Sequence, residues 1–505
     1  MKPATEQLGG EVAPHEALEP WDAFNRRLAQ NVHPAGWVNP RPSDRYHLVV
    51  IGGGTAGLVT TAIAVALGAR VALVERALLG GDCLNVGCVP SKALIEEGRA
   101  FAQRTGAGGE GGADFVAALE RMRRIRAEIS EHDSAERFRG LGADVFLGDA
   151  TFTGPDTVQV GDAVLRFRRA VVATGTSPAI PSVPGLRESG YFTNETIFSL
   201  PARPNRLAVV GGGPIGCELA QAFAAFGTRV TLLEGSDRLL PADDPEASAV
   251  VARALAREGV EVVREAIVEE VRAGSLRSRS PDGPLEVEFD ALLVAAGRVP
   301  NVEGLGLAAA GVAYDRDTGI RVDERLCTAN PRIYAIGDVA SPMRFTHVAD
   351  AHARMVVRNA LFFGRQKVND LVIPRCTYTT PELAHVGPSF DDLSTRDDVE
   401  SLTVPFSSVD RARLDGDEEG FLRVHHEKNG DRIVAATIVG VGAGELISQL
   451  TQAITAGVGL GKLADTIFPY PTRAEIIRKA GDAWRRRRLT PRAERAFGLY
   501  FRALR

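Results

Sequence analysis

Two stretches of the chain share the same order of apolar, glycine-rich and polar positions. The segment HLVVIGGGTAGLVTTAIAVALGARVALVE, from His47, predicts a buried strand, a glycine turn, an apolar helix and a second strand. The segment RLAVVGGGPIGCELAQAFAAFGTRVTLLE, from Arg206, repeats this order. Gly52 precedes Glu75 by 23 positions, and Gly211 precedes Glu234 by 23 positions. We therefore expect two βαβ units, each with a dinucleotide site.

The rest of the chain divides around these units. A helical stretch is predicted from about 97 to 139, a strand and turn at TFTGPDTVQVGD, and an apolar strand at 170–175, whose pattern returns at 291–301. Beyond about residue 374 short strands alternate with helices, which indicates an α+β domain. The predicted fold class is α/β with two Rossmann-like domains and a C-terminal α+β domain. The predicted parts are an N-terminal arm without chemistry (1–44), a first dinucleotide domain (45–195 and 315–372), a second (196–314), the α+β domain (373–482) and a basic tail (483–505).

Two terminal segments fall outside these domains. Trp37, in the proline-rich arm, is predicted to dock on the neighbouring domain. The tail WRRRRLTPRAERAFGLYFRALR is basic and has apolar residues at roughly helical spacing. It predicts a terminal helix that lies in solvent or, alternatively, on an acidic membrane surface.

Composition and charge exclude several classes of function. Of the 505 residues 45% are hydrophobic and 24% are charged, as in an ordinary globular enzyme. A net charge of -5 gives no general attraction to nucleic acid. The chain has no apolar run of about 20 residues, and its first residues lack the pattern of a signal peptide, so a cytoplasmic location is expected.

The glycine turns carry the first candidate chemistry. A G-x-G-x-x-G turn between a strand and a helix lets backbone N–H groups and the helix dipole meet a pyrophosphate, and a carboxylate after the next strand accepts hydrogen bonds from ribose hydroxyls. A purely structural glycine turn is the alternative. The acidic Glu234, with no basic residue directly after it, favours NADH over NADPH. The predicted residues are Gly52, Gly54, Thr55, Ala56, Gly57 and Glu75 in the first unit, and Gly211, Gly213, Ile215, Gly216 and Glu234 in the second.

A close pair of cysteines carries the second candidate chemistry. Cys83 and Cys88 enclose four residues at what is predicted to be the start of a helix, and Lys92 follows. A helix N-terminus and a lysine cation both stabilise a thiolate, which favours cycling between dithiol and disulfide. Two buried, unreactive cysteines are the alternative. A zinc site is not expected without a second close pair, and the scattered Cys217, Cys327 and Cys376 are interpreted as core residues.

The segment GGDCLNVGCVPSK, the two glycine turns and AIGD at 335–338 together resemble the pyridine nucleotide-disulfide oxidoreductases. This family includes lipoamide dehydrogenase, glutathione reductase and mercuric reductase, and the resemblance extends from about residue 46 to 481. It implies that the first dinucleotide domain binds FAD, that the inserted second domain binds NADH or NADPH, and that the C-terminal domain forms a homodimer.

The resemblance also implies roles for single residues. Cys88 corresponds to the thiolate beside the flavin and Cys83 to the thiol that meets the substrate, while Lys92, paired with Glu218, lies beside flavin N5. Asp338 corresponds to the carboxylate that holds the ribityl chain. The other residues implied on the cofactor side are Gly81, Asp82, Ala150, Ala173, Thr174, Gly175, Gly297 and Gly337.

Two positions depart from the family pattern. Asp82 stands where threonine is common. Near the C-terminus, where disulfide-reducing members have His-Pro-Thr-x-x-Glu, this chain has Tyr470-Pro-Thr-x-x-Glu475. Tyrosine, with a pKa of about 10, is a poor base near neutral pH. A tyrosine here is similar to mercuric reductase, although the chain lacks that enzyme's terminal cysteine pair and N-terminal metal-binding module.

The leading hypothesis is an FAD-dependent NAD(P)H oxidoreductase whose cysteine pair serves a thiol-bound soft metal ion such as Hg(II), held transiently by Cys83 and Cys88. One alternative is a lipoamide dehydrogenase-like or other disulfide reductase. Another is a flavin electron-relay protein that its basic tail attaches to a membrane or a partner.

Overall fold

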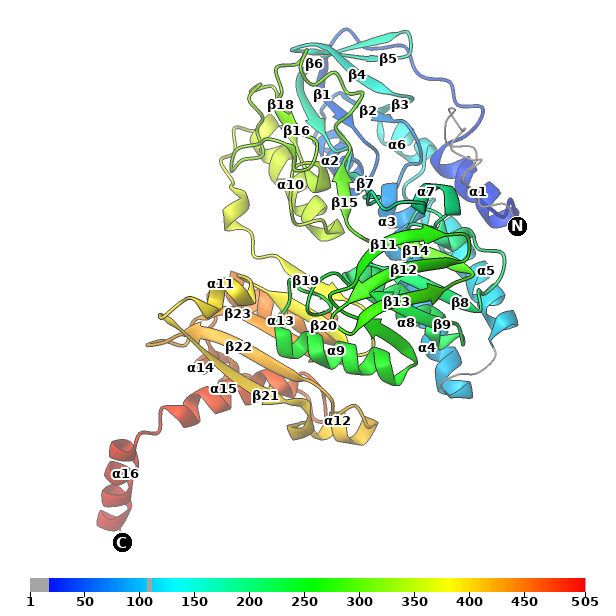
Figure 1. The fold of residues 1–505 in the computed structure, drawn as a ribbon. Coiled ribbons are helices and arrows are strands. Elements are labelled where there is room, and N and C mark those ends of the chain that lie inside the picture. The colour runs from blue at the N-terminus through cyan, green and yellow to red at the C-terminus, as the bar shows by residue number, and fades with distance from the viewer. Residues whose placement is uncertain (1–17, 107–110, 505) are drawn as a thin grey trace. The chain divides into compact units, whose positions relative to one another are not determined.

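The computed structural model describes residues 18–106 and 111–504. These residues form two compact units. The first comprises the chain up to Gly235 together with Glu258–Leu371, and the second comprises Ser236–Arg257 together with the chain from Val372 onward. Each unit is described by itself below (Figure 1).

The first unit contains a large mixed sheet. Its strands follow the order β3-β2-β1-β6-β5-β4, with β18 paired to β6. β1, β2, β3 and β18 run parallel to their neighbours, whereas β4, β5 and the first half of β6 form an antiparallel meander. The strands are β1 (Tyr46–Ile51), β2 (Val71–Glu75), β3 (Asp144–Leu147), β4 (Ala150–Gly154), β5 (Thr157–Val160), β6 (Ala163–Val172) and β18 (Ile333–Ala335).

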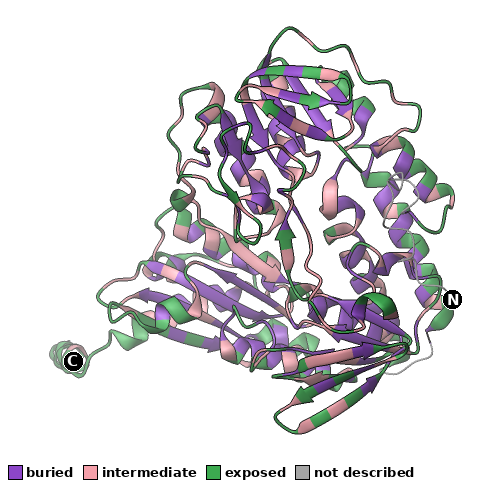
Figure 2. Ribbon diagram, turned by 45° about the horizontal axis from the view of Figure 1, so that its top comes forward, coloured by how far each residue is buried: buried purple, intermediate pink, exposed green. Residues whose placement is uncertain are grey.

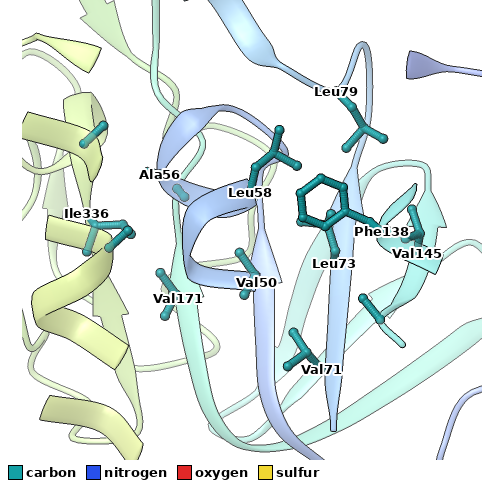
Figure 3. Packing of buried hydrophobic residues seen from close by; sticks show 14 of the residues in the cluster. Val50, Ala56, Leu58, Val71, Leu73, Leu79, Phe138, Val145, Val171 and Ile336 are labelled. Atoms are coloured by element: carbon teal, nitrogen blue, oxygen red, sulfur yellow. The ribbon is translucent and has the colours of Figure 1, made fainter. Parts of the chain in front are cut away.

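Both faces of this sheet are buried, because alternate residues of β1 point into two different cores. Leu48 and Val50 belong to one hydrophobic cluster and Val49 and Ile51 to the other. The first cluster includes residues of α2 (Thr55–Ala66), α6 (Ala135–Leu141) and α10 (Thr346–Leu361). Figure 3 shows side chains of these strands and helices converging in that cluster. The predicted βαβ unit is confirmed.

The helical stretch predicted for 97–139 starts earlier and is interrupted. α3 (Gly81–Asn85) and α4 (Cys88–Thr105) precede α5 (Gly112–Ile129) and α6. The N-terminal segment contributes α1 (Ala23–Val32), which packs on α5 and buries Leu28 and Val32. Trp37 Nε1 donates to the Val145 carbonyl over 3.1 Å, so this segment is attached to the first sheet. Residues 1–17 of the predicted arm lie outside the described residues.

The second glycine turn belongs to a second Rossmann-like sheet. Its order β10-β9-β8-β14 is entirely parallel, and an antiparallel meander β11-β12-β13 and a two-stranded ribbon of β7 and β15 accompany it. The elements are β7 (Thr176–Pro178), α7 (Leu186–Ser189), β8 (Arg206–Val210), α8 (Pro214–Ala225), β9 (Arg229–Leu233), β10 (Val260–Val263), β11 (Ile267–Arg272), β12 (Ser275–Ser280), β13 (Gly283–Glu288), β14 (Ala291–Val294) and β15 (Arg298–Pro300). β16 (Tyr314–Asp315) and β17 (Gly319–Ile320) form a separate two-stranded ribbon, and Ile320 packs in the second cluster of the first sheet.

The second unit is built on a five-stranded antiparallel sheet of order β19-β20-β23-β22-β21. Figure 2 shows its strands largely buried. α9 (Pro245–Arg257) packs on β20 and β23, which explains why it groups with this unit. The elements are β19 (Pro374–Thr377), β20 (Glu382–Val386), α11 (Phe390–Ser394), β21 (Val399–Pro405), α12 (Asp410–Asp415), β22 (Phe421–Glu427), β23 (Ile433–Gly440), α13 (Ala443–Thr455), α14 (Leu460–Asp465), α15 (Glu475–Arg487) and α16 (Pro491–Ala503).

Within the described residues, no helix combines the length and the apolar character that crossing a membrane would require.

Candidate functional site

The glycines of the first turn serve different purposes. Gly52 has φ +105°, and a Cβ there would lie 2.3 Å from the Ala173 carbonyl oxygen. A Cβ on Gly57 would lie 1.8 Å from the Gly52 carbonyl oxygen. Gly54, in contrast, has φ -77°, and its nearest neighbour would be Gly81 Cα at 3.7 Å. Neither backbone strain nor packing requires glycine at position 54.

The second turn repeats this division. A Cβ on Gly211 (φ +111°) would lie 2.4 Å from the Ala295 carbonyl oxygen, and one on Gly216 would lie 1.9 Å from the Gly211 carbonyl oxygen. Gly213 has φ -73°, and no atom lies within 4 Å of its Cβ position. Gly54 and Gly213 cap the N-termini of α2 and α8, where free N–H groups attract anions. The open space at both positions fits a pyrophosphate that approaches the backbone.

The two carboxylates that are predicted to bind ribose, Glu75 and Glu234, accept hydrogen bonds from backbone N–H groups of the same turns. Glu75 accepts hydrogen bonds from Gly53 N–H (2.5 Å) and Ala77 N–H (2.6 Å), and burial raises its pKa. Glu234 accepts one from Gly212 N–H (2.6 Å). Each carboxylate therefore lies beside its turn, where a bound ribose would reach it. The ribose contact itself stays a prediction.

The cysteine loop packs directly on the first glycine turn. Gly80 bridges to Gly54, and a Cβ on Gly81 (φ +57°) would lie 2.8 Å from Gly54 Cα. The Asn85 amide closes the loop by donating to the carbonyls of Leu79 (3.1 Å) and Gly81 (2.9 Å). This contact between glycines holds Cys83 next to the predicted pyrophosphate site.

The two cysteines lie on different helices rather than opening one. Cys83 is in α3 and Cys88 is the first residue of α4, and both are free thiols. Three effects lower the pKa of Cys88: a hydrogen bond from the Cys83 thiol, the positive charge of Lys92 and a hydrogen bond from the Thr346 hydroxyl. Together they outweigh burial, which raises this pKa, and bring it to about 6. The same hydrogen bond and burial raise the pKa of Cys83. Cys88 is therefore the thiolate of the pair.

Helix packing also sets the positions of the charged and polar groups around Cys88. Lys92 Nζ, on α4, lies 2.7 Å from Glu218 Oε2, on α8, and the Glu218 side chain is buried. Thr346 Oγ1, at the start of α10, lies 3.6 Å from Cys88 Sγ. Three helices thus bring Lys92, Glu218 and Thr346 to one thiolate. Thr346 could not be predicted from the sequence, because a single threonine at a helix start is an ordinary local feature.

Sequence reasoning also missed the partner of Asp82. Arg298, on β15, forms an ion pair with the Asp82 carboxylate and donates to Thr176 Oγ1 over 2.7 Å. Thr176 Oγ1 in turn donates to Asp338 Oδ2 over 3.2 Å, and burial raises the pKa of Asp338. Arg298 directly follows the predicted Gly297, so the glycine after β14 was the available signal. The family commonly has threonine at position 82, and in this chain Arg298 balances the negative charge that Asp82 introduces there.

The remaining residues predicted on the cofactor side lie at the ends of strands. Ala173, Thr174 and Gly175 follow β6, and Thr174 Oγ1 donates to the Asn301 carbonyl over 2.8 Å. Gly337 and Asp338 follow β18 and are close to α2, since a Cβ on Gly337 would lie 3.4 Å from Ala56 Cβ. Ala150 begins β4 and is buried in the second cluster, Ile215 lies in the first turn of α8, and Gly297 precedes β15.

Tyr470 and Glu475 lie in the second unit. The Tyr470 side chain is 71% exposed, and its hydroxyl donates to Asp410 Oδ2 over 3.2 Å. This hydrogen bond to a carboxylate raises the pKa of Tyr470. Glu475 is buried at the start of α15 and pairs with Arg478 at 3.2 Å. The phenol is exposed, so a ligand can reach it, but it is a poor general base.

The described residues contain no group of three or more His, Cys, Asp or Glu side chains arranged to hold a metal ion. Cys217 is buried and donates to the Gly212 carbonyl over 3.2 Å, while Cys327 and Cys376 are half-buried.

Comparison with known proteins gives two family matches. Residues 46–353 match the model described as pyridine nucleotide-disulphide oxidoreductase, and residues 373–481 match its dimerisation domain. Mercuric reductase from Lysinibacillus sphaericus is 33% identical over 88% of this chain and 84% of that protein. Dihydrolipoyl dehydrogenase from Thermus scotoductus is 33% identical over 87% of this chain and 97% of that protein.

A solved structure is similar as well. The Cu(II) complex of the HOCl-induced flavoprotein disulfide reductase RclA from Escherichia coli superposes with a TM-score of 0.78 at 28% identity, covering 86% of this chain and 98% of the other. The family uses FAD and NAD(P)H, and the two glycine turns fit such cofactors. The chain belongs to the pyridine nucleotide-disulphide oxidoreductases and carries the family's C-terminal dimerisation domain.

Proposed function

We propose that this oxidoreductase uses NAD(P)H to reduce a thiol-bound soft metal ion, with Hg(II) as the leading substrate. The overall reaction is NAD(P)H + Hg(SR)₂ + H⁺ → NAD(P)⁺ + Hg(0) + 2 RSH, in which both electrons of the hydride reach the metal. FAD, when bound, accepts the hydride and passes electrons on. The first dinucleotide domain would hold it and the second would hold the nicotinamide cofactor.

The observation that carries the proposal is the unequal pair of thiols. The pKa of Cys88 is lowered to about 6 and the pKa of Cys83 is raised, so Cys88 is the thiol of the pair that ionises first. Thiolates prefer soft cations, and a metal that binds both sulfurs displaces the proton of Cys83. Lys92 then offsets the charge that remains at Cys88.

Tyr470 favours a metal over a disulfide as the substrate. Dithiol–disulfide exchange near neutral pH needs a group that moves a proton, and the Asp410 hydrogen bond raises the pKa of the tyrosine away from that range. A phenol oxygen can still bind a metal that lies between two thiolates. In a homodimer formed through the C-terminal domain, Tyr470 of one subunit would serve the cysteines of the other.

Names of relatives support the same choice. Mercuric reductase is the description of several relatives at 33% identity or above, and the solved RclA binds Cu(II). Glu234, buried beside the second turn with Gly235 after it, favours NADH over NADPH.

The test is anaerobic oxidation of NADH and of NADPH by the purified holoenzyme with Hg(II) in excess thiol, and elemental mercury is collected. Cys88→Ala should abolish mercury release. Cys327→Ala is the matched control, because burial raises the pKa of that thiol and it lies outside the pair. Turnover of lipoamide without Hg(II) reduction would contradict the proposal.

A disulfide reductase is the second candidate, favoured by the identity to dihydrolipoyl dehydrogenase. It predicts lipoamide turnover that is weak at neutral pH and rises at high pH, as Tyr470 begins to ionise.

A further inference from the structure

The last helix has no partner within the described residues. α16 buries none of its residues, although Thr490 caps its N-terminus by accepting from Ala493 N–H over 3.3 Å. The family's dimerisation model ends at residue 481, before this helix begins. The family fold and its dimer interface therefore do not account for α16.

The exposed side chains of α16 separate into two faces. Phe497, Tyr500, Phe501 and Leu504 follow the spacing i, i+3, i+4, i+7, which places them on one side of a helix, and each is more than half exposed. Arg495 and Arg502 fall on the opposite side at 100° per residue. Such a helix, with an aromatic face and a basic face, is typical of segments that lie in a membrane interface.

A basic cavity opens at the start of the same helix. Its volume is about 280 Å³, and its walls include Lys428, Arg487, Arg488 and Thr490, the residue that caps α16. Glu400 is its one acidic wall residue. The Arg488 guanidinium lies 4.5 Å from the centre of the Trp484 ring, which keeps that cation at the cavity.

A buried histidine lies in the wall of this cavity. His426 is only 3% exposed and lines the cavity, and its Nδ1 lies 2.9 Å from the Glu427 carbonyl oxygen. Its Nε2 has no hydrogen-bond partner among the described residues. This nitrogen is closed to solvent, so it is not among the groups that would hold a phosphate.

We propose that the cavity and α16 form one docking surface for a membrane that contains anionic phospholipids. A lipid phosphate would enter the cavity among Lys428, Arg487 and Arg488, and the aromatic face of α16 would lie at the acyl boundary. Thr490 lines the cavity and also caps α16, so the cavity and the helix are adjacent.

The charge of the C-terminal tail favours a membrane over a second copy of the chain as the partner of this surface. From residue 485 to 504 there are seven arginines and one glutamate. Two such tails packed together would place like charges side by side, whereas an anionic lipid surface neutralises them. The surface is independent of the metal substrate, because none of its residues belongs to the cysteine site.

The test is sedimentation of the full-length holoenzyme with vesicles of phosphatidylcholine alone or with about 30 mol% phosphatidylglycerol. We expect binding to the anionic vesicles only, with release at high salt. The variants are Phe497→Ser/Tyr500→Ser/Phe501→Ser for the helix and Lys428→Gln/Arg487→Gln for the cavity, and each should weaken binding about tenfold or more. NADH oxidation should stay unchanged in both.

Matched controls are Leu414→Ser, an exposed apolar residue on α12, and Arg166→Gln, an exposed arginine on β6, and both should bind as the parent does. Equal binding to neutral vesicles, or no loss in the helix variant, would overturn the proposal. So would a lower oligomeric mass of the helix variant in sedimentation velocity, because α16 would then join copies of the chain. Saturation of the cavity by inorganic phosphate without vesicle binding would assign it to a free anion instead.

Discussion

Lys92 Nζ lies 2.7 Å from Glu218 Oε2, and this ion pair connects the helix that begins at Cys88 with the helix that begins at the second glycine turn. The two charges act on the Cys88 thiolate in opposite directions, since the lysine lowers the pKa of Cys88 and the glutamate raises it. The cysteine pair and the helix after the second glycine turn are therefore linked by one pair of side chains.

The first prediction concerns this pair. Lys92→Gln should raise the pKa of Cys88 from about 6, by about one unit, because a cation near the thiolate is lost. The measurement is the rate of alkylation of the reduced protein by iodoacetamide against pH. In the parent protein the rate should rise as pH increases through about 6, because thiolate replaces thiol there. Arg104→Gln, on the same helix, is the control, and an unmoved midpoint in Lys92→Gln would contradict the electrostatic role.

The second prediction compares two glycines of the second glycine turn. Gly213 leaves room for a ligand, whereas Gly211 is required by the backbone conformation. Gly213→Ala should leave the melting temperature almost unchanged, because φ is -73° and no atom lies within 4 Å of the new Cβ. It should raise KM for NADH about tenfold or more, since the methyl group occupies the space left for pyrophosphate. Gly211→Ala should instead destabilise the fold, because its Cβ would meet the Ala295 carbonyl oxygen at 2.4 Å. Equal loss of stability in both variants would refute this division.

The third prediction concerns the ion pair between Asp82 and Arg298. Asp82→Asn should cost about 1 kcal/mol of stability, discounted for the partial exposure of the carboxylate, because a largely buried arginine loses its charged partner. Thermal melts would show the decrease, and fluorescence of released flavin would show weaker FAD retention. Asp317→Asn, at an exposed turn, is the control. A rise in stability would mean that the pair is strained rather than favourable.

The fourth prediction concerns the substrate side. Tyr470→His should increase lipoamide reduction near neutral pH, because an imidazole titrates there and a tyrosine does not. Asp410→Asn should lower the pKa of Tyr470 by removing the carboxylate that raises it, which spectrophotometric titration near 295 nm would detect. If Tyr470→His leaves lipoamide turnover unchanged and Tyr470→Phe leaves Hg(II) reduction unchanged, position 470 does not select the substrate.

The glycine turns and the cysteine pair could be predicted from sequence because each depends on local spacing. Gly52 and Gly211 need positive φ, Gly57 and Gly216 face a carbonyl oxygen, and a buried strand precedes each turn. The α/β fold follows from those repeats and is confirmed.

The rest of the site depends on contacts between distant segments, which spacing does not reveal. Arg298 meets Asp82 across 216 positions, and Thr346 meets Cys88 across 258. The helix break between Cys83 and Cys88 also escaped prediction. It falls at Gly87, where a Cβ would lie 2.8 Å from the Asp82 carbonyl oxygen, so the break depends on a close backbone approach. The basic cavity required side chains from β21, β22 and α15 together.

The most direct test of the account is the number of titratable thiols before and after anaerobic reduction by NADH, measured in the denatured protein. The chain has five cysteines, so the oxidised enzyme should show three thiols and the reduced enzyme five. Cys327→Ala should still gain two on reduction, whereas Cys83→Ala should gain none. A gain of two thiols in Cys83→Ala, or no gain in the parent protein, would contradict the claim that Cys83 and Cys88 are the redox pair.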